Sequence, residues 1–200
     1  MDYREIREEI VSYSKQMYSE KLVTATSGNI SVRLPDRQNA FAITPSSENY
    51  MSLTEERIVI VTIDGEILSA APGARPSSEW RLHAELYRAK KEVNAVVHTH
   101  SPYATAFAVI REKIPLILIE MKVFLNGEVP LSPYAPNGTQ EVAENVSRSI
   151  GEHGACLMEN HGVVCVGKDL KSAYIRAAYT EDAARVCYMA KTMGKPVTIL

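Results

Sequence analysis

Two pairs of short apolar segments joined by tight turns constrain the fold of this chain more than any other feature. In the first pair, the β-branched segment 58–63 is followed by Asp64-Gly65 and a second apolar segment, 66–68. An Asp-Gly turn between two such segments is a strong signal for a β-hairpin. In the second pair, segments 155–158 and 163–166 flank the turn 160–162. Both pairs predict strands that neighbour each other in sequence and in the sheet.

Hydrophobic periodicity predicts the remaining elements. Apolar residues spaced by three and four predict helices, and alternating or continuous short apolar runs predict strands. The predicted further strands are 30–34, 41–44, 93–98 and 116–119, and the segment 129–135 is predicted to be irregular. The predicted helices are an opening helix ending near Lys21, then 77–90, one starting at Pro102, one from 142 to about 151, and 170–193. The order predicts one α/β or α+β domain over residues 1–200, with a mixed or antiparallel sheet layered by helices.

Charge and cysteine content exclude several classes of function. The chain has 22 Lys plus Arg and 24 Asp plus Glu, a formal net charge of −2, so it is predicted to bind no nucleic acid. The three cysteines form no CxxC pair, which favours a reducing compartment. No apolar run reaches the length of about 18 residues that spans a bilayer. The sequence therefore predicts a cytoplasmic protein that contacts no membrane.

The strongest chemical signal is His98-Thr99-His100, which follows a predicted apolar strand. Residues two apart on a strand point to the same face, and two adjacent imidazoles suit zinc. His161, at the turn between two predicted strands, is the third candidate, and Gly162 is expected to relieve backbone crowding there. The residues alone equally allow an accidental pair of surface imidazoles. His83 is predicted to lie on a helix surface and His153 in a loop.

Three turns rich in small polar residues lie at the ends of predicted elements. Such turns can aim amides and hydroxyls at an anion, and the start of a helix holds phosphate. The candidate anion-binding residues are Thr26, Ser27, Gly28, Asn29, Ser46, Ser47, Ser77 and Ser78. Ordinary turn chemistry explains the same residues. Glu79 follows the last pair, where a carboxylate stabilises the helix dipole without any catalytic role.

Two other residues have an open interpretation. Glu120 ends the predicted strand 116–119. The sequence supports two interpretations of Glu120 equally: a solvent-facing residue at a sheet edge, or an acid/base group. Tyr134 lies among prolines and is predicted to be a loop tyrosine without a chemical role.

Motifs along nearly the whole chain resemble the class II aldolase/adducin family. Each motif is modest, but their joint presence in this order is specific. They are 27–33, 43–46, 76–81, 95–100, 133–135 and 160–162. The resemblance implies a three-layer α/β (α+β) domain with a central, mainly antiparallel sheet flanked by helices. It also implies a homotetramer, a ring of four with active sites between subunits.

The resemblance implies roles for individual residues. His98, His100 and His161 match the family's zinc ligands, with one Zn2+ per subunit. Mn2+ or Co2+ would fit the same ligands. Glu79 matches the carboxylate that binds the resting metal and then acts as acid/base. The phosphate loops match the pairs 28–29, 46–47 and 77–78, although Ser47 stands where the pattern has glycine.

Two departures concern the acid that serves the aldehyde-side oxygen. The family's aldolases offer a tyrosine from a neighbouring subunit, and the matching position here is Ile119. Their catalytic C-terminal tail has no counterpart in a sequence that ends at Leu200. We therefore expect Glu120 to replace that acid, and the pocket to accept several short aldehydes.

The sequence thus predicts a metal-dependent aldolase. Its expected substrate is a ketose 1-phosphate such as L-fuculose 1-phosphate or a 5-deoxypentulose 1-phosphate, cleaved reversibly to dihydroxyacetone phosphate and a short aldehyde. The alternatives are a sugar-phosphate dehydratase, such as a methylthioribulose-1-phosphate dehydratase, or an epimerase. The epimerase branch usually has aspartate at the position of Glu79, which favours the aldolase. A non-catalytic assembly module of the adducin type is the remaining alternative, and the intact histidines argue against it.

Overall fold

The computed structural model describes residues 3–199, over which the chain forms one eight-stranded sheet with helices on both faces. The α-helices are α1 (Arg4–Ser19), α2 (Trp80–Ala89), α3 (Pro102–Val109), α4 (Gln140–Ser149) and α5 (Leu170–Met193). The strands are β1 (Asn29–Arg33), β2 (Ala40–Ile43), β3 (Val59–Thr62), β4 (Ile67–Ser69), β5 (Ala95–Thr99), β6 (Leu131–Ser132), β7 (Ala155–Met158) and β8 (Gly162–Gly167). The short turns η1 (Tyr50–Ser52), η2 (Glu55–Arg57) and the π-helical η3 (Met121–Leu125) complete the chain.

The sheet has the strand order β4-β3-β2-β1-β5-β8-β7-β6. Every neighbouring pair is antiparallel except β6 and β7, which are parallel. The two predicted hairpins are confirmed as β3–β4 and β7–β8. The predicted fold class, a central and mainly antiparallel sheet flanked by helices, is also confirmed.

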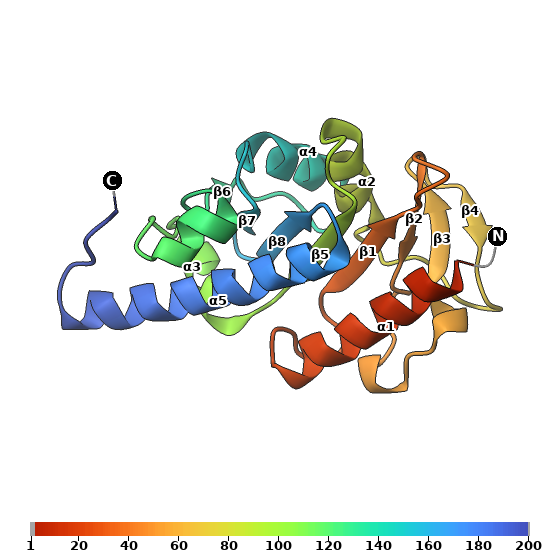
Figure 1. Cartoon of the computed structure of the whole chain (residues 1–200), viewed down its shortest axis with the longest axis horizontal. Coiled ribbons are helices and arrows are strands. Elements are labelled where there is room, and N and C mark those ends of the chain that lie inside the picture. The colour runs from red at the N-terminus through yellow and green to blue at the C-terminus, as the bar shows by residue number, and fades with distance from the viewer. Residues whose placement is uncertain (1–2, 200) are drawn as a thin grey trace.

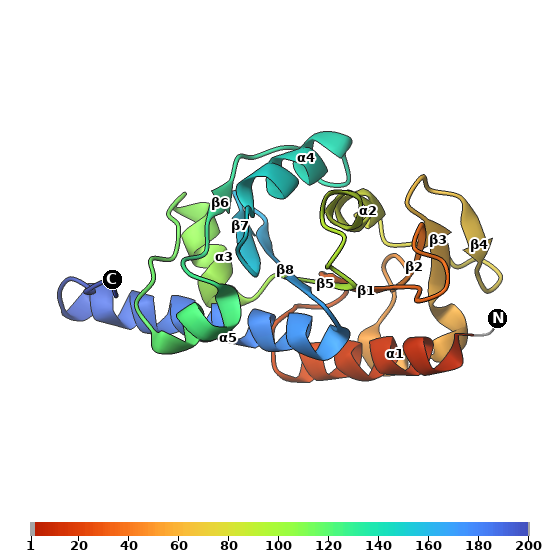
Figure 2. The ribbon, with the colours of Figure 1, turned by 45° about the horizontal axis from the view of Figure 1, so that its top comes forward.

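The helices form two layers (Figures 1 and 2). Helices α1, α3 and α5 pack on one face of the sheet, and α2 and α4 pack on the other. In β1, Ile30 and Val32 point into the core beneath α1 and α5, while Ser31 reaches residues of α2. This alternation follows from the period of two along a strand.

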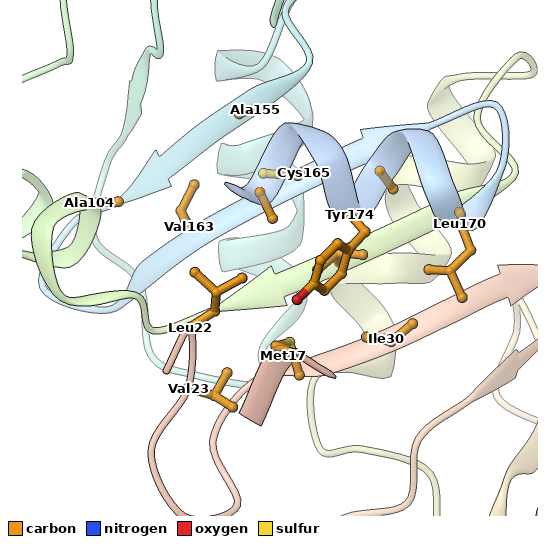
Figure 3. Packing of buried hydrophobic residues seen from close by; sticks show 14 of the residues in the cluster. Met17, Leu22, Val23, Ile30, Ala104, Ala155, Val163, Cys165, Leu170 and Tyr174 are labelled. Carbon is orange, nitrogen blue, oxygen red and sulfur yellow. The ribbon is translucent and has the colours of Figure 1, made fainter. Parts of the chain in front are cut away.

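The larger core lies between the sheet and α5 (Figure 3). Tyr174 and Leu170 of α5 lie over the strands, and Met17 of α1 and Ile30 of β1 lie beside them. Helix α5 begins with a capping box in which the side chains of Asp169 and Ser172 bond each other's backbone N–H. The sequence predicted the extent of this helix correctly.

One predicted strand is wrong. Segment 116–119 is not a strand: it runs as bends into a helical turn that begins at Ile119 and continues as η3. Its apolar residues are only half-buried or exposed, with Ile119 at 58%. An apolar run is therefore not sufficient for a strand: here the Leu118 carbonyl accepts from Met121 N–H in the following turn, and the Leu116 carbonyl accepts from Ile199 N–H.

Two smaller differences concern boundaries. The segment predicted as irregular contains β6, whose two residues pair with β7. Helix α2 begins at Trp80 rather than at Ser77, with Glu79 in the N-cap position.

Among the described residues, no helix combines the length and apolar content that a membrane crossing needs.

Candidate metal centre

The middle strands of the sheet bring the three predicted histidine ligands together. β5 lies between β1 and β8, so His98 on β5 is close to His161, which directly precedes β8. Glycines allow this close approach. A Cβ on Gly28 would lie 2.7 Å from the carbonyl oxygen of His98, and one on Gly162 would lie 2.4 Å from that of Thr99. The predicted crowding at Gly162 is thus confirmed.

Four side chains meet at this point. The ligand atoms of Glu79, His98, His100 and His161 all lie within 4.8 Å of one another. The Nε2 atom of His98 is 3.1 Å from Glu79 Oε2 and 3.0 Å from His100 Nε2. Glu79 Oε1 is 3.3 Å from His161 Nε2. In a tetrahedral zinc site with bonds of about 2.1 Å, ligand atoms lie about 3.4 Å apart, so these separations fit a divalent cation.

Burial and neighbouring charges determine the ionisation of the pair formed by Glu79 and His98. Burial would raise the pKa of the Glu79 carboxyl, but His98, His161 and a hydrogen bond from Asn29 outweigh it and hold that pKa well below its usual range. Burial would lower the pKa of His98, but the carboxylate of Glu79 outweighs it and raises that pKa. Glu79 is therefore ionised at neutral pH. The N-terminal end of α2 further favours this negative charge.

The other two imidazoles are neutral at pH 7. Burial, with the charge of His98 adding to it, lowers the pKa of His100 to about 3 and that of His161 to about 4. A histidine binds a metal in its neutral form, so both are ready to act as ligands.

One oxygen of the cluster has no hydrogen-bond partner in the described part of the chain. Glu79 Oε1 is buried and accepts no hydrogen bond there. A buried charged oxygen without a partner is costly, and a cation among the four ligand atoms would compensate it. The residues therefore fit a divalent metal ion. Three nitrogens and one oxygen suit Zn2+, and the same set accepts Mn2+ or Co2+.

The three polar turns surround this cluster at the same end of the sheet. Pro45 and Pro76 form an isolated β-bridge that joins the second and third turns. The first turn leads into β1, and its Gly28 lies against the backbone of His98. The third turn ends at Glu79. The structure thus brings together all three turns that the sequence predicted for anion binding.

The candidate anion-binding residues differ in what they contact. The Ser27 hydroxyl donates to Thr24 in its own turn, the Ser77 hydroxyl accepts from the Glu79 N–H, and the Asn29 amide contacts Glu79. Ser47, Ser78 and Thr26 are exposed, and Ser46 is half-buried. The exposed hydroxyls are therefore the ones accessible to an anion.

Ser47 has a backbone conformation that favours glycine. Its φ is 61°, in the left-handed region where a Cβ is disfavoured. Its hydroxyl lies 3.4 Å from that of Ser46. The glycine-like conformation persists here although the residue carries a side chain.

The prediction for His83 is wrong. It was expected on a helix surface but is fully buried, and both of its ring nitrogens form hydrogen bonds, to Asn29 and to Ser31. The available signal was its position in the sequence: it lies four residues after Glu79, on the same side of the helix.

Other candidates lie away from the cluster. Glu120 is half-buried at the start of the turn that leads into η3, not at a strand end, and it is not one of the four clustered residues. Tyr134 is 59% exposed in a loop, as predicted. His153 also lies in a loop, where its ring contacts the carbonyl oxygen of Asn126.

Sequence comparison gives a consistent set of relatives. The family model described as "Class II Aldolase and Adducin N-terminal domain" matches residues 8–188. The chain is 34% identical to an L-fuculose phosphate aldolase of Methanococcus maripaludis, over 90% of this chain and 93% of that protein. It is 35% identical to a 5-deoxy-D-ribulose 1-phosphate aldolase of Bacillus thuringiensis, over 95% of this chain and 87% of that protein.

Structural comparison agrees. A solved structure of L-fuculose 1-phosphate aldolase superposes with a TM-score of 0.93 at 31% identity, covering 98% of this chain and 91% of that one.

Proposed function

The chain belongs to the class II aldolase and adducin family, and from this premise we propose that it is a metal-dependent aldolase. The proposed reaction cleaves a ketose 1-phosphate reversibly into dihydroxyacetone phosphate and a short aldehyde. The names of the two relatives, an L-fuculose phosphate aldolase and a 5-deoxy-D-ribulose 1-phosphate aldolase, support this substrate class.

One observation carries the proposal: the buried cluster of three imidazoles and one carboxylate that has an unpartnered oxygen. We propose His98, His100, His161 and Glu79 as ligands of one Zn2+, with Mn2+ or Co2+ as alternatives. When bound, such a cation polarises a substrate carbonyl as a Lewis acid. An assembly module has no need of four titratable side chains gathered at one point, two of them buried and two half-buried, which supports catalysis.

The chain's own residues supply the remaining chemistry. Cleavage breaks the C3–C4 bond of the ketose, removes the C4 hydroxyl proton and adds a proton at C3. In the direction of aldol addition, Glu79 is the proposed base that removes the proton from the carbon that becomes C3, because it is ionised and one of its oxygens is unpartnered. In cleavage the same carboxyl, now carrying that proton, returns it to C3. The proposed phosphate site is formed by the three polar turns, with Ser46, Ser47 and Ser78 offering hydroxyl donors.

A second acid/base is required at the C4 oxygen, and we propose Glu120 of a neighbouring subunit. The apolar side chains next to it support an interface: Ile119 is 58% exposed and Val123 is 68% exposed. Exposed apolar groups of this kind favour contact with another chain. This role assumes a homotetramer whose active sites lie between subunits.

The test of the reaction is a substrate panel with metal-loaded protein. Dihydroxyacetone phosphate is supplied with lactaldehyde, acetaldehyde or glycolaldehyde, and product is followed by NMR. We expect a new ketose 1-phosphate with at least one aldehyde, lost on treatment with a chelator and restored by added Zn2+ or Co2+. Absence of any aldol product, or dehydration of methylthioribulose 1-phosphate instead, would overturn the proposal in favour of a dehydratase. A protein that holds no divalent metal and no activity would fit the assembly module.

Glu120 is tested separately, with Glu128→Gln as the control, because Glu128 is half-buried like Glu120 and pairs with Lys113 on the same part of the chain. Glu120→Gln should reduce cleavage steeply. It should leave proton exchange on dihydroxyacetone phosphate intact, since that exchange requires only Glu79 and the metal. Equal loss of both reactions, or loss of neither, would show that Glu120 has no such separate role.

A further inference from the structure

A row of buried polar side chains continues from the metal cluster into the core between β1 and α2. Its members come alternately from the two elements. In order from the cluster, they are Glu79, Asn29, His83, Ser31, Tyr87 and Arg33. All six are at most 6% exposed.

The geometry of a helix and a strand explains this alternation. The α2 members are four residues apart, which is about 6 Å along a helix. The β1 members are two residues apart, which is about 6.6 Å along a strand. Because the two repeats nearly match, each helix side chain meets the strand side chain opposite it. We call Asn29, Ser31, His83 and Tyr87 the β1–α2 hydrogen-bond chain.

The contacts in this chain are short and continuous. Asn29 Nδ2 donates to Glu79 Oε2 over 2.9 Å, and Asn29 Oδ1 lies 2.5 Å from His83 Nε2. Ser31 Oγ lies 2.6 Å from His83 Nδ1 and 2.6 Å from the Tyr87 hydroxyl. At the far end, the Arg33 guanidinium lies over the Tyr87 ring, 4.7 Å from its centroid.

The orientation of the Asn29 amide sets the direction of the hydrogen bonds that follow. Its Nδ2 donates to Glu79 Oε2, and its Oδ1, which can only accept, faces His83 Nε2. His83 must then donate from Nε2. Burial lowers the pKa of His83 to about 3, so the ring is neutral and its bare Nδ1 accepts from Ser31. The single proton of Ser31 is thereby used, and Tyr87 must donate to the Ser31 oxygen.

We propose that the β1–α2 hydrogen-bond chain is a positioning device for Glu79, with His83 as its central member. His83 holds the Asn29 amide in the one orientation that donates to Glu79 Oε2. That oxygen is thereby fixed in place, and Oε1 faces the cluster as the atom that binds a metal or carries a proton. The metal-binding part of this inference rests on the proposed function, whereas the hydrogen-bond direction does not.

The direction is tested first, in metal-free protein. Side-chain ¹⁵N NMR at pH 7 should show His83 as the neutral tautomer with its proton on Nε2. A proton on Nδ1, or a charged ring, would overturn the proposal whatever the protein does with metal or substrate.

The positioning role is tested by Co2+ affinity, measured by competition with a chromophoric chelator, and by the visible spectrum of bound Co2+. His83→Phe removes both hydrogen bonds while keeping the ring. It should weaken Co2+ binding by about 10-fold or more, the range expected when a partner of a metal ligand is lost. His83→Gln offers an amide donor in place of Nε2 and should recover most of that loss. Tyr87→Phe, at the far end, should have a smaller effect.

Matched controls separate positioning from general loosening of the fold. Tyr174→Phe removes another buried tyrosine hydrogen bond, to Glu20. Ser14→Ala, compared with Ser31→Ala, removes a buried hydroxyl that lies outside the β1–α2 hydrogen-bond chain and has no hydrogen-bond partner among the described residues. Tyr174→Phe should lower the unfolding midpoint, Ser14→Ala should not, and neither control should change Co2+ affinity or the spectrum of bound Co2+. Equal weakening by controls and chain variants, or wild-type affinity in His83→Phe, would overturn positioning. If the Co2+ affinities change as expected but the protein catalyses no aldol reaction, only the proposed function is overturned.

Discussion

His98 donates its Nδ1–H to the backbone carbonyl of Val163 over 2.9 Å, across the pair of strands β5 and β8. This contact turns the opposite ring nitrogen, Nε2, toward Glu79, which lies 3.1 Å away. A backbone acceptor cannot rotate away as a side chain can. The orientation of the imidazole is therefore a property of the sheet, as is typical of metal-binding histidines.

Loss of either strand histidine should abolish metal binding. We expect His98→Ala or His100→Ala to lose most of the bound metal and activity, because only two of the three imidazole ligands then remain. Metal content per chain is measured by elemental analysis, and circular dichroism checks that the fold survives. His153→Ala, in a loop away from the cluster, is the control. Full metal occupancy in the His98 or His100 variant would contradict the proposed site.

Glu79→Gln separates metal binding from proton transfer. The amide keeps the shape of the side chain but is no base, so turnover should fall by about 10²–10⁴, the usual contribution of a general base. Metal affinity should fall, but the three unchanged imidazoles should still hold the ion when it is supplied in excess, and turnover is measured under that condition. Glu85→Gln, on the same helix, should behave as wild type in kcat. Near-normal turnover in Glu79→Gln would mean that another group moves the proton.

Gly162→Ala tests the close approach of β8 to β5. The new Cβ would lie 2.4 Å from the Thr99 carbonyl oxygen and 3.1 Å from His100 Cδ2. Since backbone atoms must shift, we expect a loss of about 1–3 kcal/mol in the free energy of unfolding together with weaker metal binding. Urea unfolding and metal titration measure the two effects. The control Gly194→Ala adds a Cβ in open space and should change neither stability nor metal binding. Wild-type stability and metal binding in Gly162→Ala would argue against the tight packing of β8 on β5.

Ser47→Gly should stabilise the protein. The φ of 61° at this residue disfavours a Cβ, so glycine should raise the free energy of unfolding by up to about 1 kcal/mol. Ser46→Gly is the matched control. Ser46 is not one of the described residues with a positive φ, so the same change there should lower the free energy of unfolding. A loss of stability at both positions in urea unfolding would refute the strain at Ser47.

Acid should destabilise the metal-free protein partly through His83. Burial and the charge of His98 lower its pKa from 6.5 to about 3. At a pH between 3 and 6.5, His83 is therefore protonated in the unfolded chain but neutral in the folded chain. The stability is fully present above pH 6.5 and falls as the pH decreases, by up to about 1.4 kcal/mol per pH unit for one group. Urea unfolding from pH 4.5 to 7.5 should give a shallower slope for His83→Gln, and an unchanged slope would rule this contribution out.

Local sequence patterns were sufficient to predict most of the helices and strands and to propose the three histidine ligands. Hairpins β3–β4 and β7–β8 and the full extent of α5 follow from short-range patterns, because turn residues and periodicity act within one element. The shared face of His98 and His100 follows from the period of a strand. His161 was a third candidate from its place at a turn between two predicted strands, but adding Glu79 required the resemblance to a family, since no local pattern reports contacts between distant segments.

Strand pairing and the burial of polar residues depend on contacts between distant segments, so they became visible in the folded chain alone. Segment 116–119 has strand-like composition yet forms no strand, because its carbonyls bond to Met121 N–H and Ile199 N–H instead of to a neighbouring strand. His83 occupies a helix position that suggested exposure, but β1 offers Asn29 and Ser31 opposite it. Burial of a polar side chain depends on the partners that the facing element supplies. Those partners lie 52 and 54 residues away in sequence, beyond the reach of any local signal.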